Sequence, residues 1–141
     1  RRMDLVTDLR LSPLPDSKMV LSEIGVLNAY FELYWHYTNG ELLRFDFPQK
    51  HLNKFPDRTY KQLLMTAIAN QMNSINTWIA IQNEYLKDYY VLYLHYANGM
   101  DIPADFPEVI LDYFPGRTFI HQLKGAITAL QQEINSEKEA M

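Results

Sequence analysis

Hydrophobic residues recur along most of this sequence at the spacing of one face of an α-helix. Four that stand at i, i+3, i+4 and i+7 are Tyr30, Leu33, Tyr34 and Tyr37. This spacing predicts a long helix over residues 17–37 and a similar one over residues 78–96. Asn-Gly follows each of them, at 39–40 and 98–99. Because glycine tolerates positive φ, this pair indicates a helix end, and the sequence predicts an all-α fold.

Short helices are expected after these two helix ends. Asp-Phe-Pro stands at 46–48 and again at 105–107, and proline is favoured in the first turn of a helix. We expect short helices over 48–54 and 107–113. A Phe-Pro pair follows each, and it ends the helix because the residue before proline is pushed out of the α region.

The same motifs return at an interval of 59 residues. The matched segments are 30–40 over 89–99, 46–48 over 105–107, and 55–59 over 114–118. The sequence therefore predicts a tandem duplication of a helix–short helix–helix unit of about 59 residues, forming a helical bundle or hairpin-repeat domain. The expected divisions are an extended N-terminal arm over 1–16, a first repeat over 17–77, a second repeat over 78–136 that shares its core, and a frayed tail over 137–141.

The join between the repeats has two interpretations. A third helix starts near Asp57, and from there to Asn98 the chain has no glycine or proline and keeps its helical spacing. One continuous helix is therefore possible. We favour a tight turn over 73–77, where Ser, Asn and Thr are available as caps, because a helix of about 40 residues is rare in a domain of this size.

Composition excludes several classes of protein. The 141 residues are 48% hydrophobic and 21% charged, with a net charge of −4 and no cysteine. Disulfide frameworks, thiolate zinc sites and cysteine nucleophiles are excluded. Nucleic-acid binding is not expected, because the chain lacks a basic footprint beyond Arg1, Arg2 and Arg10. No apolar run is long enough for a membrane span, and we expect a cytoplasmic location.

The histidines offer one candidate ligand site. His36 and His95 each stand in a Tyr-x-His-Tyr setting near a helix end. A two-fold relation between repeats could bring them together around a metal or small ligand, although a role at the helix end is favoured, since a metal needs three or four ligands. We expect no cofactor. His51 and His121 have no histidine counterpart and are expected at the surface.

Two arginines recur together with two aspartates. Arg58 and Arg117 lie near helix starts, and Asp46 and Asp105 precede the short helices. One interpretation is a pair of anion sites. We favour an Arg–Asp bridge within each repeat, because both copies would need the same structural contact.

The chain is rich in tyrosine, with ten in all. A ladder of tyrosines at helical spacing is a candidate interaction surface, or else an inter-helix seam; its members are Tyr30, Tyr34, Tyr37, Tyr85, Tyr89, Tyr93 and Tyr96. The third helix of the first repeat is also more apolar than its counterpart, through Leu63, Met65, Ala69 and Met72. Exposed apolar side chains there would mark a contact surface.

No catalytic motif is present: the chain has no nucleophile elbow, no glycine-rich phosphate loop and no H-E-x-x-H. We therefore expect a non-enzymatic protein-interaction module, either an adaptor or a self-assembling structural domain with a tyrosine-rich helical surface, whose partner is another protein or a second copy. The alternative is a small-ligand or metal-binding helical domain with its site between the repeats, around His36 and His95.

Overall fold

A computed structural model describes residues 9–141 of the chain. The described part is all-helical and contains no strand, as the sequence predicts. The helices are α1 (Ser17–Asn39), α2 (Gln49–Lys54), α3 (Lys61–Asn98), α4 (Glu108–Tyr113) and α5 (Ile120–Ala140). Three short 3₁₀ turns accompany them, η1 (Leu9–Leu11), η2 (Arg58–Tyr60) and η3 (Arg117–Phe119).

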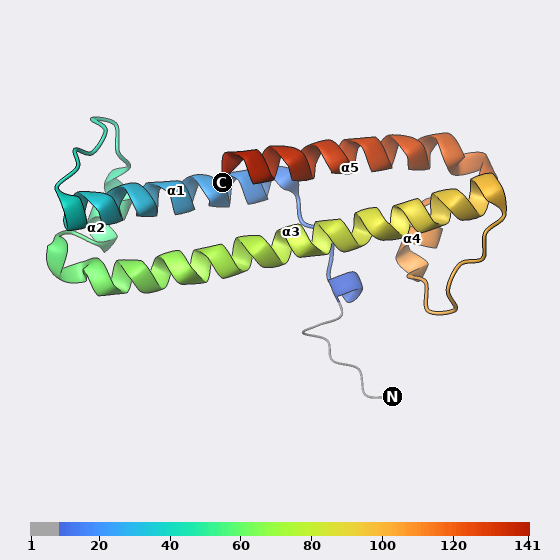
Figure 1. Ribbon diagram of the computed structural model, residues 1–141, viewed down its shortest axis with the longest axis horizontal. Coiled ribbons are helices and arrows are strands. Elements are labelled where there is room, and N and C mark those ends of the chain that lie inside the picture. The colour runs from blue at the N-terminus through green and yellow to red at the C-terminus, as the bar shows by residue number, and fades with distance from the viewer. Residues whose placement is uncertain (1–8) are drawn as a thin grey trace.

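Helix α3 is the long axis of the molecule (Figure 1). Its 38 residues extend about 57 Å at 1.5 Å per residue. Helix α1 packs antiparallel along the first part of α3, and α5 packs antiparallel along the remainder. The start of α1 and the end of α5 overlap near the middle, where Asn28 Nδ2 donates to the Ala140 carbonyl at 3.0 Å. Three long helices therefore lie side by side at the centre of the molecule, whereas towards each end two long helices are accompanied by one short helix, α2 or α4.

Local structure repeats every 59 residues. Helices α2 and α4, turns η2 and η3, and the starts of α3 and α5 are all separated by that interval. The predicted helix ends are confirmed: Gly40 and Gly99 adopt φ of 72° and 71°, and their N–H groups donate to the carbonyls of His36 and His95. We call residues 17–75 the first half and residues 76–140 the second half.

The expected turn over 73–77 is wrong, because α3 is continuous. The Thr77 hydroxyl, which we expected to cap a new helix, donates instead to the Asn73 carbonyl at 2.9 Å within α3. Ile75 and Ile79 are buried at the centre of the molecule, where α1 and α5 meet α3. Burying them against both partners requires an unbroken helix, so tertiary packing decides between the two interpretations.

The chain ends also differ from expectation. Helix α5 runs to Ala140 and Glu137 is fully buried, so residues 137–140 are not frayed. In the arm, residues 9–11 form a 3₁₀ turn, and the described remainder up to Asp16 is non-helical. Asp16 caps α1 by accepting from the Lys18 N–H at 2.9 Å. The rest of the predicted arm, including Arg1 and Arg2, lies outside the described residues.

Candidate interaction surface

One face of α3 in the first half is apolar and exposed. Met65, Ala69 and Met72 stand at i, i+4 and i+7 and therefore share a helical face. Met65 is 46% exposed and Met72 is 36% exposed. The positions 59 residues later, on α5, hold polar residues: Lys124, Thr128 and Gln131. We call the Met65, Ala69 and Met72 set the apolar face.

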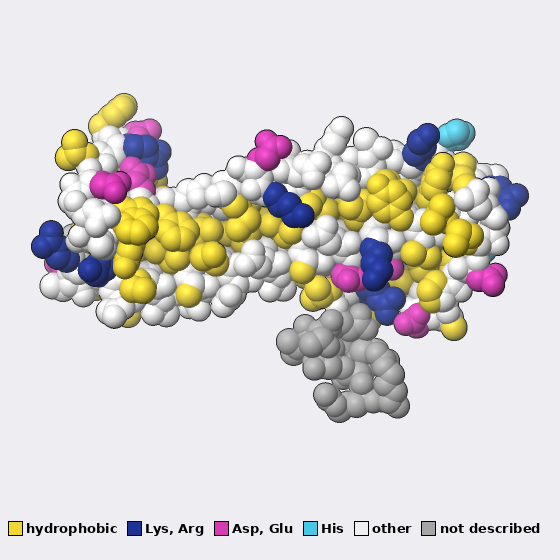
Figure 2. All heavy atoms as spheres, in the orientation of Figure 1, with side chains coloured by type: hydrophobic (Ala, Val, Ile, Leu, Met, Phe, Trp, Pro, Cys, Tyr) yellow, Lys and Arg dark blue, Asp and Glu magenta, His cyan; other side chains and the backbone are white. Residues whose placement is uncertain are grey.

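In the second half, aromatic side chains lie beside the positions of α5 that correspond to the apolar face. There, a groove of about 240 Å³ between α3 and α5 is lined by Tyr90, Tyr93, Lys124, Ile127 and Thr128. The same positions in the first half hold only apolar and aromatic residues: Phe31, Tyr34, Met65, Ile68 and Ala69. Figure 2 shows hydrophobic side chains in a band along the long axis of the molecule, with few charged groups among them. Met65 and Met72 have flexible side chains, which suit an adaptable contact.

Most of the tyrosine ladder lies in the core. Five members are at most 9% exposed, namely Tyr30, Tyr37, Tyr85, Tyr89 and Tyr96, whereas Tyr34 and Tyr93 are half-buried. These five therefore form an inter-helix seam and do not provide the tyrosine-rich surface that we expected. On each helix, the helical spacing places the buried tyrosines on one side, and that side faces the neighbouring helix.

Two of the buried tyrosines hold the short helices against the long ones. The hydroxyl of Tyr37 donates to the Phe55 carbonyl at 2.5 Å, and that of Tyr96 donates to the Phe114 carbonyl at 2.5 Å. Burial raises the pKa of both phenols, and Asp57 adds to the shift at Tyr37. The raised pKa keeps each phenol neutral, and only the neutral phenol can donate this hydrogen bond. The two hydroxyls therefore serve to pack the short helices against the long ones.

Ring contacts repeat this pattern. Tyr30 packs edge-on against Phe55 at 5.6 Å between centroids, and Tyr89 packs against Phe114 at 5.7 Å. Burial, followed by the neighbouring Tyr85, Tyr113 and Glu133, raises the pKa of Tyr89 to about 12. Such edge-to-face pairs stabilise a core beyond the area that they bury.

The two candidate ligand histidines lie at opposite ends of the molecule. His36 belongs to the last turn of α1 and His95 to the last turn of α3, and Figure 1 places these two helix ends at opposite extremes of the long axis. Each ring donates from Nδ1 to a loop carbonyl, that of Glu41 or Met100, at 2.5 Å. Each histidine therefore fixes the loop after its own helix, and no site shared by the two is formed.

His51 corrects a second expectation. It is only 5% exposed, and its ring lies 5.2 Å from that of Tyr30 and 5.9 Å from that of Phe47. Burial, followed by the charges of Lys50 and Lys54, lowers the pKa of His51. The isoleucine at the matching position, Ile110, is also buried, which indicates that the position is a core site. His121 is exposed, as expected.

The predicted Arg–Asp bridges are replaced by others. Arg58 and Arg117 are exposed, and within residues 9–141 neither forms an ion pair. Asp46 lies 3.8 Å from Arg44, and Asp105 lies 3.1 Å from Arg10. Asp57 uses its carboxylate to cap η2 at the Thr59 N–H, 2.9 Å away. These contacts involve neighbours that the 59-residue match does not pair, which is why the repeat pattern failed to identify them.

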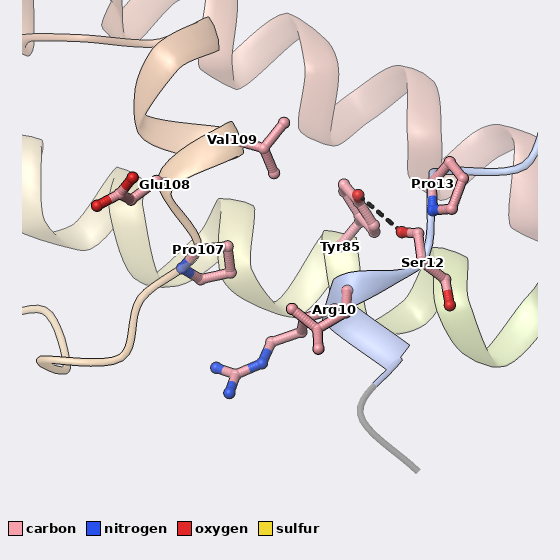
Figure 3. A pocket seen from close by; sticks show the side chains of 8 residues that line it. Arg10, Ser12, Pro13, Tyr85, Pro107, Glu108 and Val109 are labelled. Carbon is pink, nitrogen blue, oxygen red and sulfur yellow. Dashed lines mark hydrogen bonds between the residues drawn. The ribbon is translucent and has the colours of Figure 1, made fainter. Parts of the chain in front are cut away.

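The N-terminal segment packs across the second half (Figure 3). Tyr85 donates its hydroxyl to the Ser12 carbonyl at 3.0 Å, and Arg10 pairs with Asp105. A groove of about 410 Å³ lies beside this segment, lined by Arg10, Leu11, Ser12, Pro13, Tyr85, Pro107, Glu108 and Val109. In the first half, Val26 stands at the position of Tyr85, and valine lacks the hydroxyl that holds the segment.

Polar groups are buried beneath this segment. Gln82 Nε2 donates to Glu137 Oε2 at 2.9 Å, and both side chains are fully buried. Asp88 is also buried; desolvation raises its pKa, and the nearby Arg10 partly opposes that shift. The matching residue of the first half is Ala29. Tyr85 and Asp88 thus distinguish the second half, across which the N-terminal segment packs, from the first half.

Two exposed apolar side chains were missed by sequence reasoning. Leu42 is 93% exposed and Phe45 is 103% exposed, in the loop between α1 and α2. Figure 2 shows hydrophobic groups projecting at that end of the molecule. Their counterparts in the second half are Asp101 and Ala104, so a comparison of the loops across the 59-residue interval was the signal that could have found them.

Residues 9–141 contain no cluster of three or more histidine or acidic side chains arranged to hold a metal ion. Over the same residues, none of the helices combines the length and the apolar character that crossing a membrane requires. Comparison of the chain with protein-family models, with curated proteins and with solved structures gives no match.

Proposed function

We propose that this chain is a non-enzymatic interaction module, which contacts a protein partner through the apolar face of its first half. The observation that carries this proposal is the exposure of Met65 and Met72 where the matching helix has Lys124 and Gln131. The two helices begin 59 residues apart, each after a short helix and a 3₁₀ turn, which supports the view that the fold does not require methionine there. Exposed apolar side chains in a contiguous set are typical of contact surfaces.

We further propose that the two halves descend from duplication of a unit of about 59 residues. Three observations support this: the matched sequence segments, the matched element boundaries, and the hydroxyl–carbonyl bonds of Tyr37 and Tyr96. Under this hypothesis, residues shared by the halves maintain the fold, and residues that differ between exposed matching positions are the candidates for function.

The partner is either another protein, with the module acting as an adaptor, or a second copy in a structural assembly. Half-buried aromatics on α1 and flexible methionines on α3 suit contact with the apolar face of an amphipathic helix from the partner. We also propose a cytoplasmic setting, supported by the absence of cysteine from the sequence.

The test is site-specific photo-crosslinking in cells, with the crosslinking residue placed at Met72 or, as matched control, at Gln131. We expect a defined adduct, with another protein or with a second copy, at Met72 alone. The Met65→Lys/Met72→Gln variant, which installs the residues of the second half, should abolish an adduct formed from a crosslinker at Ala69. Equal labelling at Met72 and Gln131, or none at either, would overturn the proposal.

A further inference from the structure

The two ends of the molecule have the same backbone design and opposite charge. The segments 39–61 and 98–120 each contain a loop, a short helix and a 3₁₀ turn. The first has five Lys or Arg and three Asp or Glu, whereas the second has one Arg and four Asp or Glu. We call segment 39–61 the basic end and segment 98–120 the acidic end. Figure 1 places them at opposite extremes of the long axis.

The charges with matching spacing lie on the short helices. Lys50 and Lys54 stand at i and i+4 on α2, and Glu108 and Asp112 stand at i and i+4 on α4. Residues four apart share a helical face, so each end presents one pair of like charges. All four side chains are exposed. Within residues 9–141 none of the four forms an ion pair.

Both ends also expose large apolar side chains. Leu42 and Phe45 project from the loop of the basic end with almost no contact to their own chain. At the acidic end, Tyr113 is 61% exposed and Met100 is 53% exposed. Each end therefore combines apolar side chains with a charged helix, which is the composition of a small protein interface with a charged rim.

The loop of the basic end is held in place before any partner arrives. The Arg44 N–H and Nε donate to the Glu32 carboxylate at 3.1 and 2.9 Å, and the guanidinium lies over the Phe47 ring, 5.8 Å from its centroid. A loop fixed in this way loses less conformational entropy on binding. Leu42 and Phe45 are thus presented by an ordered support.

We propose that the basic end of one molecule docks onto the acidic end of a second copy, head to tail. Lys50 and Lys54 would face Glu108 and Asp112, and Leu42 and Phe45 would pack near Tyr113 and Met100. The two surfaces of such a contact are different, so a docked pair still has one free basic end and one free acidic end, and the assembly is open-ended. Charge complementarity of this kind selects the partner and its orientation.

A membrane surface is the rival occupant of the basic end, since exposed apolar and basic side chains also bind anionic bilayers. Glu41 and Asp46 stand directly beside Leu42 and Phe45, and Arg44 is engaged by Glu32. Carboxylates next to the inserting side chains oppose an anionic bilayer, and a complementary acidic end exists in the same chain. These two observations favour a second copy.

The experiment is sedimentation equilibrium of the full chain across micromolar to millimolar concentrations. We expect a weight-average mass that rises above the monomer mass of 16.6 kDa with concentration and falls with added salt. The K50E/K54E variant and the E108K/D112K variant should each weaken association at least about tenfold, because like charges then face each other. The variant with all four reversals should recover it, which also shows that the reversed helices fold.

Two controls separate the possible outcomes. The L42D/F45A variant, which carries the loop residues of the second half, should lose association, while M65K/M72Q should keep it, because this contact does not use the apolar face. If head-to-tail docking through the two ends is wrong, the proposed function of the apolar face is therefore unaffected. If the proposed function is wrong, head-to-tail docking is likewise unaffected. A mass that stays monomeric, or four reversals that fail to restore association, would overturn head-to-tail docking. Binding of the monomer to phosphatidylserine vesicles, lost in L42D/F45A, would assign the basic end to a membrane.

Discussion

The first and second halves of this molecule are similar inside and different outside. Inside, Tyr37 and Tyr96 donate to carbonyls 18 residues further along the chain, and Gly40 and Gly99 end their helices in the same left-handed conformation. Outside, Met65 and Met72 on α3 stand at positions where α5 has Lys124 and Gln131. The comparison separates residues that the fold needs from residues that it tolerates.

The difference is also visible at the centre of the molecule. Tyr85 and Asp88 meet the N-terminal segment, whereas Val26 and Ala29 occupy the same positions in the first half. The second half therefore contacts the N-terminal segment through a residue that the first half does not share, whereas the first half exposes Met65 and Met72.

The largest effect is expected from a proline within α3. Asn76→Pro removes a backbone donor and places the ring against the carbonyl of the preceding turn, at a cost of about 3 kcal/mol or more. Because α3 belongs to both halves, both should lose structure together in urea unfolding followed by circular dichroism. The matched variant Asn135→Pro, near the end of α5, should cost less. Equal destabilisation by the two prolines would show that α3 is not the shared support of the fold.

An intermediate and equal effect is expected at the two buried hydroxyls. Tyr37→Phe or Tyr96→Phe leaves a buried carbonyl without its donor and should each lower the free energy of unfolding by about 1 to 2 kcal/mol. The two sites lie at opposite ends of the molecule, so the double variant should show the sum of the two losses. Chemical denaturation of the three variants measures this, and clearly unequal single losses would contradict the similarity of the halves.

The smallest effect is a difference in pH dependence. Burial lowers the pKa of His51, so the folded protein binds this proton less readily than the unfolded chain does. Stability is therefore fully present above the unfolded pKa of about 6.5 and declines as the pH falls from there towards the lower folded pKa. His51→Ile, which installs the residue of the second half, should remove this part of the decline.

Melting temperatures at about pH 7.5 and about pH 5 compare the two proteins across that window. The variant His121→Gln supplies the control, because it removes a histidine from an exposed position. A decline that persists in full in His51→Ile would show that protonation of His51 does not oppose folding.

The local elements of the fold were predictable because short motifs determine them. Asn-Gly places Gly40 and Gly99 in the left-handed region, and Asp-Phe-Pro places a proline immediately before α2 and α4. These signals depend on neighbours in sequence. The continuity of α3 depends instead on the overlap of α1 and α5 beside Ile75 and Ile79, and no local motif encodes that overlap.

The candidate surface was predictable only in part. The sequence itself shows that apolar Met65 and charged Lys124 stand at matching positions, and this contrast identifies the apolar face. Helical spacing shows that the tyrosines share one side of a helix, but it does not show whether that side is buried in an inter-helix seam or exposed as an interaction surface. The sequence alone is therefore compatible with both interpretations of the tyrosine ladder. Phe45 belongs to a loop, where periodicity gives no information about exposure. His51 is buried, and its residue type gives little guidance because histidine is intermediate in its tendency to be buried.

The unbroken α3 has a consequence for anything attached to the two extremes of the molecule. A helix without proline or glycine curves gently and does not kink sharply, and α3 contains neither residue, so it keeps those extremes at a fixed separation and orientation. A flexible joint at residue 75 would let that spacing vary. A chain of such molecules would therefore have a constant axial period, set by one uninterrupted run of backbone hydrogen bonds.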